Sequence, residues 1–313
     1  MLPAVRGAIA VLGGYGRLGR ACVLELAAQT HAPLVVAGRN AQRAESLALS
    51  LGERARASYA DAADPRVLAR VLEGASAVVA CQSGDVLAAL QCALELRVPF
   101  VGVSAVPLDP RSRRHVAELA WRAQVPVVLH AGAVPGISGI LAESLVRRLP
   151  AIAALRIAST GSGAAAPADD GGAPARRWPE RWTFAEPIGA RAVVPALSAD
   201  LDGFAEAHCV AELEYLEPPA RGIARTVGRL VARRAGAGFA VAARATPPGD
   251  GPPVVVEVGA TEPIAPAAAL VGALCAALLE RRLPAGLSTP REALSPTAAL
   301  GALEKRGARV RFG

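Results

Sequence analysis

The sequence predicts an α/β fold, with a doubly wound parallel sheet followed by an α+β second domain whose sheet is mostly antiparallel. Three observations support this fold class. Residues 1–150 alternate short apolar runs with amphipathic segments. The runs "LVVAG", "AVVAC" and "VPVVLHAG" are continuously apolar, which is typical of parallel strands covered on both faces. After about residue 150, strand patterns follow one another, which favours an antiparallel sheet.

The first region is predicted to consist of alternating strands and helices. The expected strands are Ala8–Gly13, Pro33–Gly38, Ala55–Asp61, Ala77–Gln82, Pro99–Ser104 and Pro126–Gly132. The expected helices are Arg17–Gln29, Ala41–Leu51, Pro65–Glu73, Asp85–Arg97 and Pro110–Ala123. Asn40, Asp64 and Asp109 stand directly before three of these helices, where a short polar side chain can cap the free N–H groups. Strands and helices in this order predict a doubly wound sheet.

The second region contains a flexible loop, several strands and a long apolar helix. The expected loop is Gly161–Pro174, and "PPGDGP" is expected to join the last two strands of the region as a hairpin. The expected strands are Leu155–Ser159, Trp182–Glu186, Ala207–Glu217, Gly238–Thr246 and Pro253–Thr261; the expected helices are Arg221–Arg234, Pro266–Arg282 and Pro296–Arg306, before an extended Ala308–Phe312. We therefore expect a dinucleotide-binding domain over residues 1–135 and a substrate and dimerisation domain over residues 136–285. A tail, 286–313, is expected to pack back on the first domain.

Composition excludes several classes of function. The chain has a net charge of +7, but its basic residues are spread among acidic ones and only 4% of residues are aromatic, so we expect no nucleic-acid partner. Lys305 is the only lysine, which excludes a P-loop and a Tyr-x-x-x-Lys pair. The five cysteines show no C-x-x-C spacing, so no metal site is expected. No apolar run reaches the length of a membrane span, and we expect a soluble, cytoplasmic protein.

The stretch "VLGGYGRLGR" carries the spacing G-x-G-x-x-G at Gly14, Gly16 and Gly19. It follows an apolar strand and opens a helix, which is the setting of a Rossmann dinucleotide-binding turn. Gly14 permits the tight turn, Gly16 lets a pyrophosphate approach the backbone, and Gly19 lets the helix pack close to the sheet. The intervening Tyr15, Arg17 and Leu18 are expected to border the cofactor as well. The alternative is a plain turn between a strand and a helix.

The end of the second strand indicates which dinucleotide binds. An NAD site places Asp or Glu there, whereas this chain has Gly38-Arg39-Asn40. The guanidinium of Arg39 suits a 2′-phosphate, so we predict NADP as the cofactor, with Asn40 beside it. The alternative is that Arg39 is an exposed loop arginine. Four further cofactor residues are expected at the ends of the third and fourth strands: Asp61, Cys81, Gln82 and Ser83.

Several stretches resemble the saccharopine dehydrogenase-like family of NADP-binding oxidoreductases. They are "VLGGYGRLGRA", "VVAGRNAQRAESLA", "LEGASAVVACQSGDVLAALQCALELRVPFVGVSA" and "VLHAGAVPGISGILAESLV", with the tail "GLSTPREALSP" and "LEKRGARVRF". The resemblance covers residues 8–145 best. It implies a Rossmann domain followed by a substrate domain that often pairs two subunits. It also implies chemistry on C–N bonds of amino-acid-derived substrates, and in some relatives on C=C bonds.

The chain departs from the amino-acid-handling relatives at two places. Gly102-Val103-Ser104 stands where they resemble one another in Asp-Thr-Ser, and Val134 stands where several have Asp before the Pro-Gly of the crossover to the second domain. Both changes remove a carboxylate that would hold a substrate ammonium group or move a proton.

Candidate catalytic and substrate residues cluster at the ends of the fifth and sixth strands and after the flexible loop. His130 is a candidate proton donor and Ser104 a candidate hydrogen-bonding group, although either can be structural. The candidate substrate residues are Gly132, Pro135, Gly136, Trp178, Arg181 and Trp182. We predict an NADP-dependent oxidoreductase acting on a C=N or C–N bond of a small metabolite, as a homodimer of bacterial-type secondary metabolism. The alternatives are a C=C reductase of the same family and a non-catalytic NADP-binding regulatory or assembly protein.

Overall fold

The computed structural model describes residues 7–82, 86–106, 108–161, 180–218, 238–249 and 251–313. The chain divides into two compact units. The first contains residues 1–132 and 267–294, and the second contains residues 133–266 and 295–313. Residues 267–285, predicted as part of the second domain, group with the first unit, and residues 295–313, predicted as a tail on the first domain, group with the second unit.

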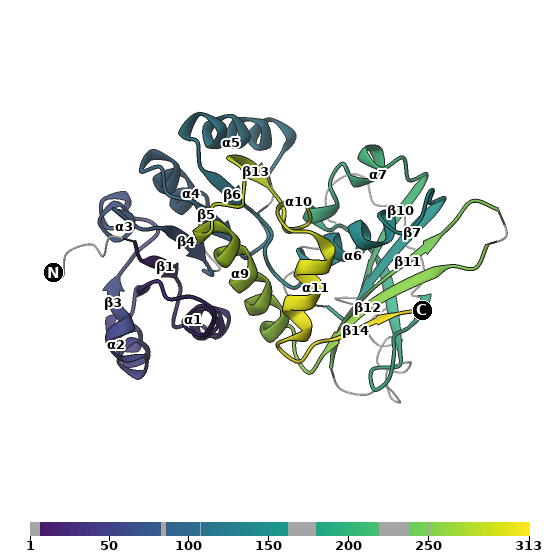
Figure 1. Ribbon diagram of the computed structural model, residues 1–313, viewed down its shortest axis with the longest axis horizontal. Coiled ribbons are helices and arrows are strands. Elements are labelled where there is room, and N and C mark those ends of the chain that lie inside the picture. Colours follow the sequence, from purple (N-terminus) through teal and green to yellow (C-terminus); the bar gives the residue numbers. More distant parts are fainter. Residues whose placement is uncertain (1–6, 83–85, 107, 162–179, 219–237, 250) are drawn as a thin grey trace. The chain divides into compact units, whose positions relative to one another are not determined.

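The first unit contains a parallel sheet of seven strands in the order β13-β6-β5-β4-β1-β2-β3 (Figure 1). The strands are β1 (Ile9–Leu12), β2 (Leu34–Gly38), β3 (Ala55–Tyr59), β4 (Ala77–Ala80), β5 (Phe100–Gly102), β6 (Pro126–Val128) and β13 (Gly286–Ser288). The predicted doubly wound sheet is therefore confirmed. Strand β13 was not predicted, because three residues are too few to show a periodic pattern. It pairs with β6, with Leu287 opposite Val127.

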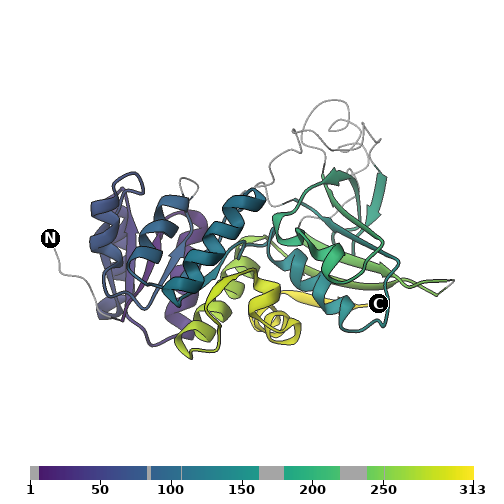
Figure 2. The same cartoon turned by 90° about the horizontal axis from the view of Figure 1, so that it is seen from above.

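Helices cover both faces of this sheet (Figure 2). They are α1 (Arg17–Gln29), α2 (Ala41–Ser50), α3 (Pro65–Leu72), α4 (Val86–Glu95), α5 (Pro110–Ala123), α9 (Ile264–Leu279, nearly all of it in this unit) and α10 (Pro290–Ala293), with the short 3₁₀ turn η1 (Gly52–Arg54). The predicted caps are present, since Asn40 accepts a hydrogen bond from the Arg43 N–H and Asp64 and Asp109 cap α3 and α5. Helix α9 packs on α1, because a Cβ added at Gly272 would lie 2.9 Å from the Gln29 side chain.

The second unit contains a mixed sheet in the order β14-β12-β11-β7-β10-β9-β8. Its strands are β7 (Ala154–Ser159), β8 (Glu180–Thr183), β9 (Ala190–Ala196), β10 (Glu212–Glu217), β11 (Phe239–Thr246), β12 (Val254–Ala260) and β14 (Arg309–Phe312). Among the strands that the structure describes here, only the β7–β10 pair is parallel, so the predicted mostly antiparallel sheet is confirmed. The hairpin of β11 and β12 was also predicted correctly.

Different elements pack on the two faces of the second sheet. Helix α6 (Ile137–Val146) packs on β7, β11 and β12, and α11 (Pro296–Glu304) packs on α6. Trp182, Phe184 and Ile188 pack with Leu216 and the alanines of β7 and β11 to form a separate apolar cluster. The remaining elements are α7 (Phe204–Ala207) and η2 (Ala199–Leu201). The predicted strand Ala207–Glu217 begins only at Glu212, and the predicted helix 221–234 lies outside the described residues.

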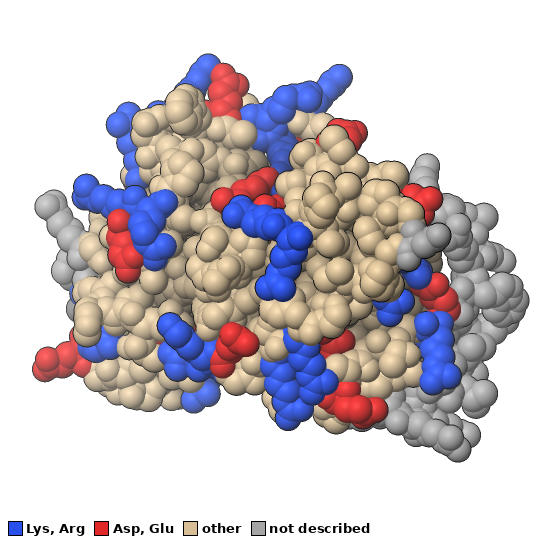
Figure 3. All heavy atoms as spheres, turned by 45° about the vertical axis from the view of Figure 1, so that its right-hand side comes forward, with Lys and Arg blue, Asp and Glu red and all other residues tan. Residues whose placement is uncertain are grey.

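No helix among the described residues combines the length and the apolar character needed to cross a membrane. On the face drawn in Figure 3, the Lys and Arg side chains are interspersed with Asp and Glu side chains.

Candidate functional site

The turn between β1 and α1 leaves no room for side chains at its glycines. A Cβ at Gly19 would lie 2.1 Å from the Gly13 carbonyl oxygen, and one at Gly14 would lie 2.9 Å from the Val11 carbonyl oxygen. Gly13 itself has a φ of 70°, in the left-handed region. The turn therefore depends on glycine at these positions, as the spacing predicts.

The N-terminus of α1 is open to an anion. Its N-cap, Gly16, offers no side-chain hydrogen bond, and no acidic residue lies in the first turn. The first N–H groups of a helix have no partner within the helix and lie at the positive end of its dipole. They can bind a phosphate group directly. Arg17 and Leu18 begin this helix beside Gly16.

Tyr15 braces the end of β2. Its ring lies against Gly38, where an added Cβ would be only 2.4 Å from Tyr15 Cε1. The backbone N–H of Asn40 donates to the Tyr15 hydroxyl oxygen at 2.9 Å, and the Arg43 guanidinium lies 5.0 Å from the centre of the Tyr15 ring. The sequence suggested Tyr15 only as a neighbour of the glycines. The structure gives it a second role, which is to hold the Gly38-Arg39-Asn40 turn.

A cavity of about 430 Å³ lies at the carboxyl ends of β1 to β4. Of the predicted cofactor residues, the cavity is lined by Tyr15, Gly16, Arg39, Asp61, Cys81 and Gln82. Arg39 is exposed, and Asp61 accepts a hydrogen bond from the Ala63 N–H at 3.1 Å. The cavity is also lined by Gly13 and by the alanines of the β3–α3 turn, none of which the sequence had indicated as cofactor residues. Ser83 lies outside the described residues.

Cys81 lies at the inner wall of this cavity. A hydrogen bond with Cys22 of α1, together with burial, holds the pKa of the Cys81 thiol well above its usual value. Burial, with a smaller effect from Cys22, also raises the pKa of Cys275, and Cys275 in turn contributes to the raised pKa of Cys81. A thiol with a raised pKa is a weak nucleophile at neutral pH, so Cys81 serves as a wall rather than a reactive group.

The two predicted catalytic residues lie at the ends of β5 and β6. The Ser104 hydroxyl donates to the Gln82 carbonyl oxygen at 3.2 Å and so links the segments that follow β5 and β4. His130 is buried, with 3% exposure, and has a φ of 66°, which is uncommon for a residue with a side chain. Gly132 is buried two residues further on.

In the second unit, a buried carboxylate holds the N-terminus of α6. Asp200 Oδ2 accepts hydrogen bonds from the Gly136 N–H at 2.8 Å, the Gly139 N–H at 2.7 Å and the Ser138 hydroxyl at 2.7 Å. Asp200 is 1% exposed, and the Ser198 hydroxyl donates to its Oδ1 at 2.6 Å. Gly136 is the N-cap with a φ of 136°, next to Pro135. The sequence places Asp200 64 residues after Gly136, so no local pattern indicated this contact.

The three candidate substrate residues Trp178, Arg181 and Trp182 differ in their settings. Trp182 is 3% exposed and lies in the apolar cluster of the second sheet, with the Arg244 guanidinium 4.7 Å from its ring centre. Trp182, which the sequence placed among the candidate substrate residues, is therefore part of the apolar core of this unit. Arg181 is exposed, and Trp178 lies outside the described residues.

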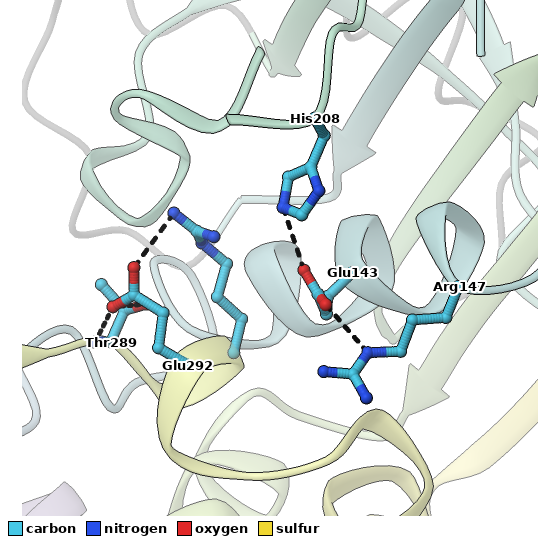
Figure 4. A network of polar contacts seen from close by, with 6 residues as sticks. Glu143, Arg147, His208, Thr289 and Glu292 are labelled. Carbon is cyan, nitrogen blue, oxygen red and sulfur yellow. Dashed lines mark hydrogen bonds and ion pairs between the residues drawn. The ribbon is translucent and has the colours of Figure 1, made fainter. Parts of the chain in front are cut away.

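Two polar clusters are drawn in Figure 4, one from each unit. In the second unit, Glu143 of α6 accepts a hydrogen bond from Arg147 Nε at 2.8 Å and lies 3.2 Å from His208 Nε2. His208 follows α7, so Glu143 ties α6 to α7. In the first unit, the Thr289 N–H donates to Glu292 Oε2 at 2.7 Å, and this bond caps the N-terminus of α10. Both clusters stabilise helices.

The fold and the glycine turn define a class of nucleotide-binding protein. Residues 13–128 match a family of domains described as NAD(P)H-binding. No protein with a curated description matches the chain.

Two solved structures share the fold over nearly the whole chain. Saccharopine dehydrogenase (L-Glu forming) from Saccharomyces cerevisiae matches with a TM-score of 0.69 and 13% identity, over 98% of this chain and 100% of that one. GenD2 from gentamicin A biosynthesis, in complex with NAD, matches with a TM-score of 0.53 and 14% identity, over 98% of this chain and 93% of that one. The predicted resemblance to saccharopine dehydrogenase is thus confirmed at the level of the fold.

Proposed function

We propose that the protein is an NADP-dependent oxidoreductase that acts on a C=N or C–N bond of a small, amino-acid-derived metabolite. The observation that carries the cofactor assignment is the braced Gly38-Arg39-Asn40 turn. Tyr15 holds this turn through the Asn40 N–H, and Arg39 lines the cavity beside it. A guanidinium at the end of the second strand suits the 2′-phosphate that distinguishes NADP from NAD.

The similarity in fold to saccharopine dehydrogenase (L-Glu forming) supports the proposed reaction class, because that protein is a dehydrogenase that forms an amino acid. When bound, the cofactor supplies or accepts the hydride. We assign the pyrophosphate to the open N-terminus of α1 and the adenosine end to the cavity lined by Arg39 and Asp61. His130 remains our candidate for the proton donor, and Ser104 for positioning.

A C=C reductase is the second candidate. Gly102 and Val134 stand where amino-acid-handling relatives carry Asp, and a neutral enone or enoyl substrate needs no carboxylate to hold an ammonium group. The two candidates are separated by offering the NADPH complex a cyclic imine, 2-methyl-1-pyrroline, and a cyclic enone, 2-cyclohexen-1-one, and following the loss of NADPH absorbance. Oxidation with the imine and not with the enone supports the proposal, and the reverse overturns it.

The cofactor assignment is tested by Arg39→Ala. A charge-assisted hydrogen bond contributes about 1.5–3 kcal/mol, so NADPH affinity should fall roughly 10- to 100-fold while NADH affinity changes less than about twofold. Fluorescence titration with each nucleotide measures both. Arg114→Ala, which removes another exposed arginine of the same unit, is the control and should change neither affinity. An equal loss for NADPH and NADH in R39A would contradict a contact with the 2′-phosphate.

A further inference from the structure

A small cavity lies on one face of the second sheet, beside its edge strand β14. It has a volume of about 120 Å³ and is lined by β12, β14 and the turn between β8 and β9, all of which belong to the second unit. The charged and small residues of its two strands are Glu257 and Gly259 on β12 and Arg309 and Arg311 on β14. Glu257 pairs with Arg311, and Gly259 pairs with Arg309. Since paired residues of antiparallel strands point to the same face, all four share one face of the sheet.

Gly259 forms an open floor for this cavity. A Cβ added at Gly259 would meet nothing closer than the Phe239 carbonyl oxygen at 4.0 Å, so no described side chain fills the space above it. Residues 185–188, in the turn between β8 and β9, form another wall. A cavity of roughly 150 Å³ is large enough to hold benzene. This cavity therefore has room for a molecule about as large as glycine or alanine.

Glu257 gives the cavity a buried carboxylate in a fixed position. The residue is 7% exposed, and the Ala185 N–H lies 3.0 Å from each of its two oxygens. Because a carboxylate has about four acceptor sites and a single N–H is shared between these oxygens, Glu257 can still accept hydrogen bonds from an ammonium group. Burial raises the pKa of Glu257, and a cation in the cavity would offset the cost of burying its charge.

The arginines of β14 give the same cavity positive charge. Arg311 lies opposite Glu257 in the sheet, and its charge opposes the rise in the pKa of that carboxyl. Arg309 is exposed, and the described part of the chain contains no acidic side chain that forms an ion pair with it. A guanidinium group binds a carboxylate through two parallel hydrogen bonds. A molecule that lies over Gly259 would therefore meet a carboxylate on one side and a guanidinium on the other.

We propose that this cavity binds a small α-amino acid as its zwitterion, with the ammonium group on Glu257 and the carboxylate on Arg309. Glycine and L-alanine are the amino acids that its volume accommodates. A simple anion would use only the arginines and would leave the buried carboxylate without a cation, whereas a zwitterion matches both charges. The site lies wholly in the second unit and requires neither a nucleotide nor turnover, so it goes beyond the proposed oxidoreductase activity and is tested independently of it.

Calorimetric titration of the whole protein at pH 7.5 tests both charged contacts. The ligands are glycine, acetate and methylammonium, and wild type should bind glycine at least tenfold more tightly than either ion with a single charge. Glu257→Gln should lose at least tenfold in glycine affinity and none in acetate affinity. Arg309→Ala should lose at least tenfold in glycine affinity and none in methylammonium affinity, and Arg309→Lys should keep part of the glycine affinity. Equal glycine affinity in wild type and E257Q, or no binding of glycine to wild type, would overturn the proposal.

Glu186→Gln is the matched control for the buried carboxylate. Glu186 lines the same cavity but is exposed, so its removal should weaken glycine binding by less than about threefold. If E186Q weakens glycine binding as much as E257Q does, the loss reflects the overall charge of the cavity, and the assignment of the ammonium group to Glu257 is wrong. Acetate that binds wild type as tightly as glycine would show a site for anions only and would also overturn the proposal.

Gly259→Ala tests whether the amino acid lies in this cavity. The added methyl group has room within the folded chain but takes up part of the floor, so the affinities for glycine and L-alanine should fall at least threefold while urea denaturation shows no loss of stability. Gly301→Ala, in α11 of the same unit, also adds a methyl group in open space and should change neither affinity. Unchanged amino-acid affinity in G259A would show that the ligand binds elsewhere, and the proposal would fail.

Discussion

The turn at the start of the first unit and the polar region at the start of α6 in the second unit are built in opposite ways. The first uses neighbouring residues: Gly13, Gly14, Gly16 and Gly19 lie within one turn, and the polar groups at the start of its helix are backbone N–H groups. The second gathers groups from distant segments, because Asp200 lies 64 residues after Gly136 and 62 residues after Ser138 in the sequence. A local arrangement is visible in the sequence, whereas one assembled by the fold is not.

The largest effect is expected from Gly19→Ala. The new Cβ would lie 2.1 Å from the Gly13 carbonyl oxygen and 2.8 Å from Gly14 Cα. Both contacts are with the backbone, so relieving them would require the turn itself to move. We expect a loss of about 3 kcal/mol or more in the free energy of unfolding, with loss of nucleotide binding. Urea denaturation and NADPH titration measure both.

Gly301→Ala is the matched control for this variant. Gly301 lies inside helix α11, and an added Cβ would meet nothing within 4 Å. Since glycine inside a helix is less favourable than alanine, we expect a gain of about 0.5–1 kcal/mol. Similar destabilisation by both substitutions would show that the close packing at Gly19 is not what makes that glycine necessary.

The next largest effect is expected from Asp200→Asn. The amide has one acceptor oxygen where the carboxylate has two, and its NH₂ group would face N–H and O–H groups that now donate to Asp200. Leaving such buried donors unsatisfied should cost about 2–4 kcal/mol in the free energy of unfolding. The exposed Glu212→Gln of the same unit also removes one charge and should change stability by less than about 0.5 kcal/mol. A loss as small in D200N as in E212Q would mean that the polar region does not hold α6.

How far the sequence predicts the molecule follows from the same contrast. The predicted bounds of α1 and α5 agree with the structure because Gly16, Asp109 and the apolar spacing all act within a few residues. The glycine turn and Arg39 could be singled out for the same reason, and Arg39 does line the cavity at the ends of β1 to β4. Strand β13 was missed because it is held by pairing with β6, and Asp200 was missed because only tertiary folding brings it to Gly136. Trp182 was named as a candidate substrate residue because it stands in the arginine- and tryptophan-rich stretch "ARRWPERWTF", which does not reveal the apolar cluster that buries it.

The smallest effect is expected at Glu257 of β12, where a buried carboxylate has partners but is still penalised by burial. Both of its oxygens lie 3.0 Å from the Ala185 N–H, and Arg311 of β14 lies opposite it in the sheet. Burial raises the pKa of Glu257 despite these partners. The folded protein therefore holds this proton more tightly than the unfolded chain does, and stability falls as the pH rises from the ordinary glutamate value through the raised one. Glu257→Gln does not titrate and its oxygen can still accept from Ala185, so it should be more stable than the wild type by about 1 kcal/mol or less at pH 7.5 and not at pH 4. Urea denaturation of both proteins at the two pH values measures this difference, and a difference that does not change with pH would mean that burial of the charge at Glu257 is not what limits stability there.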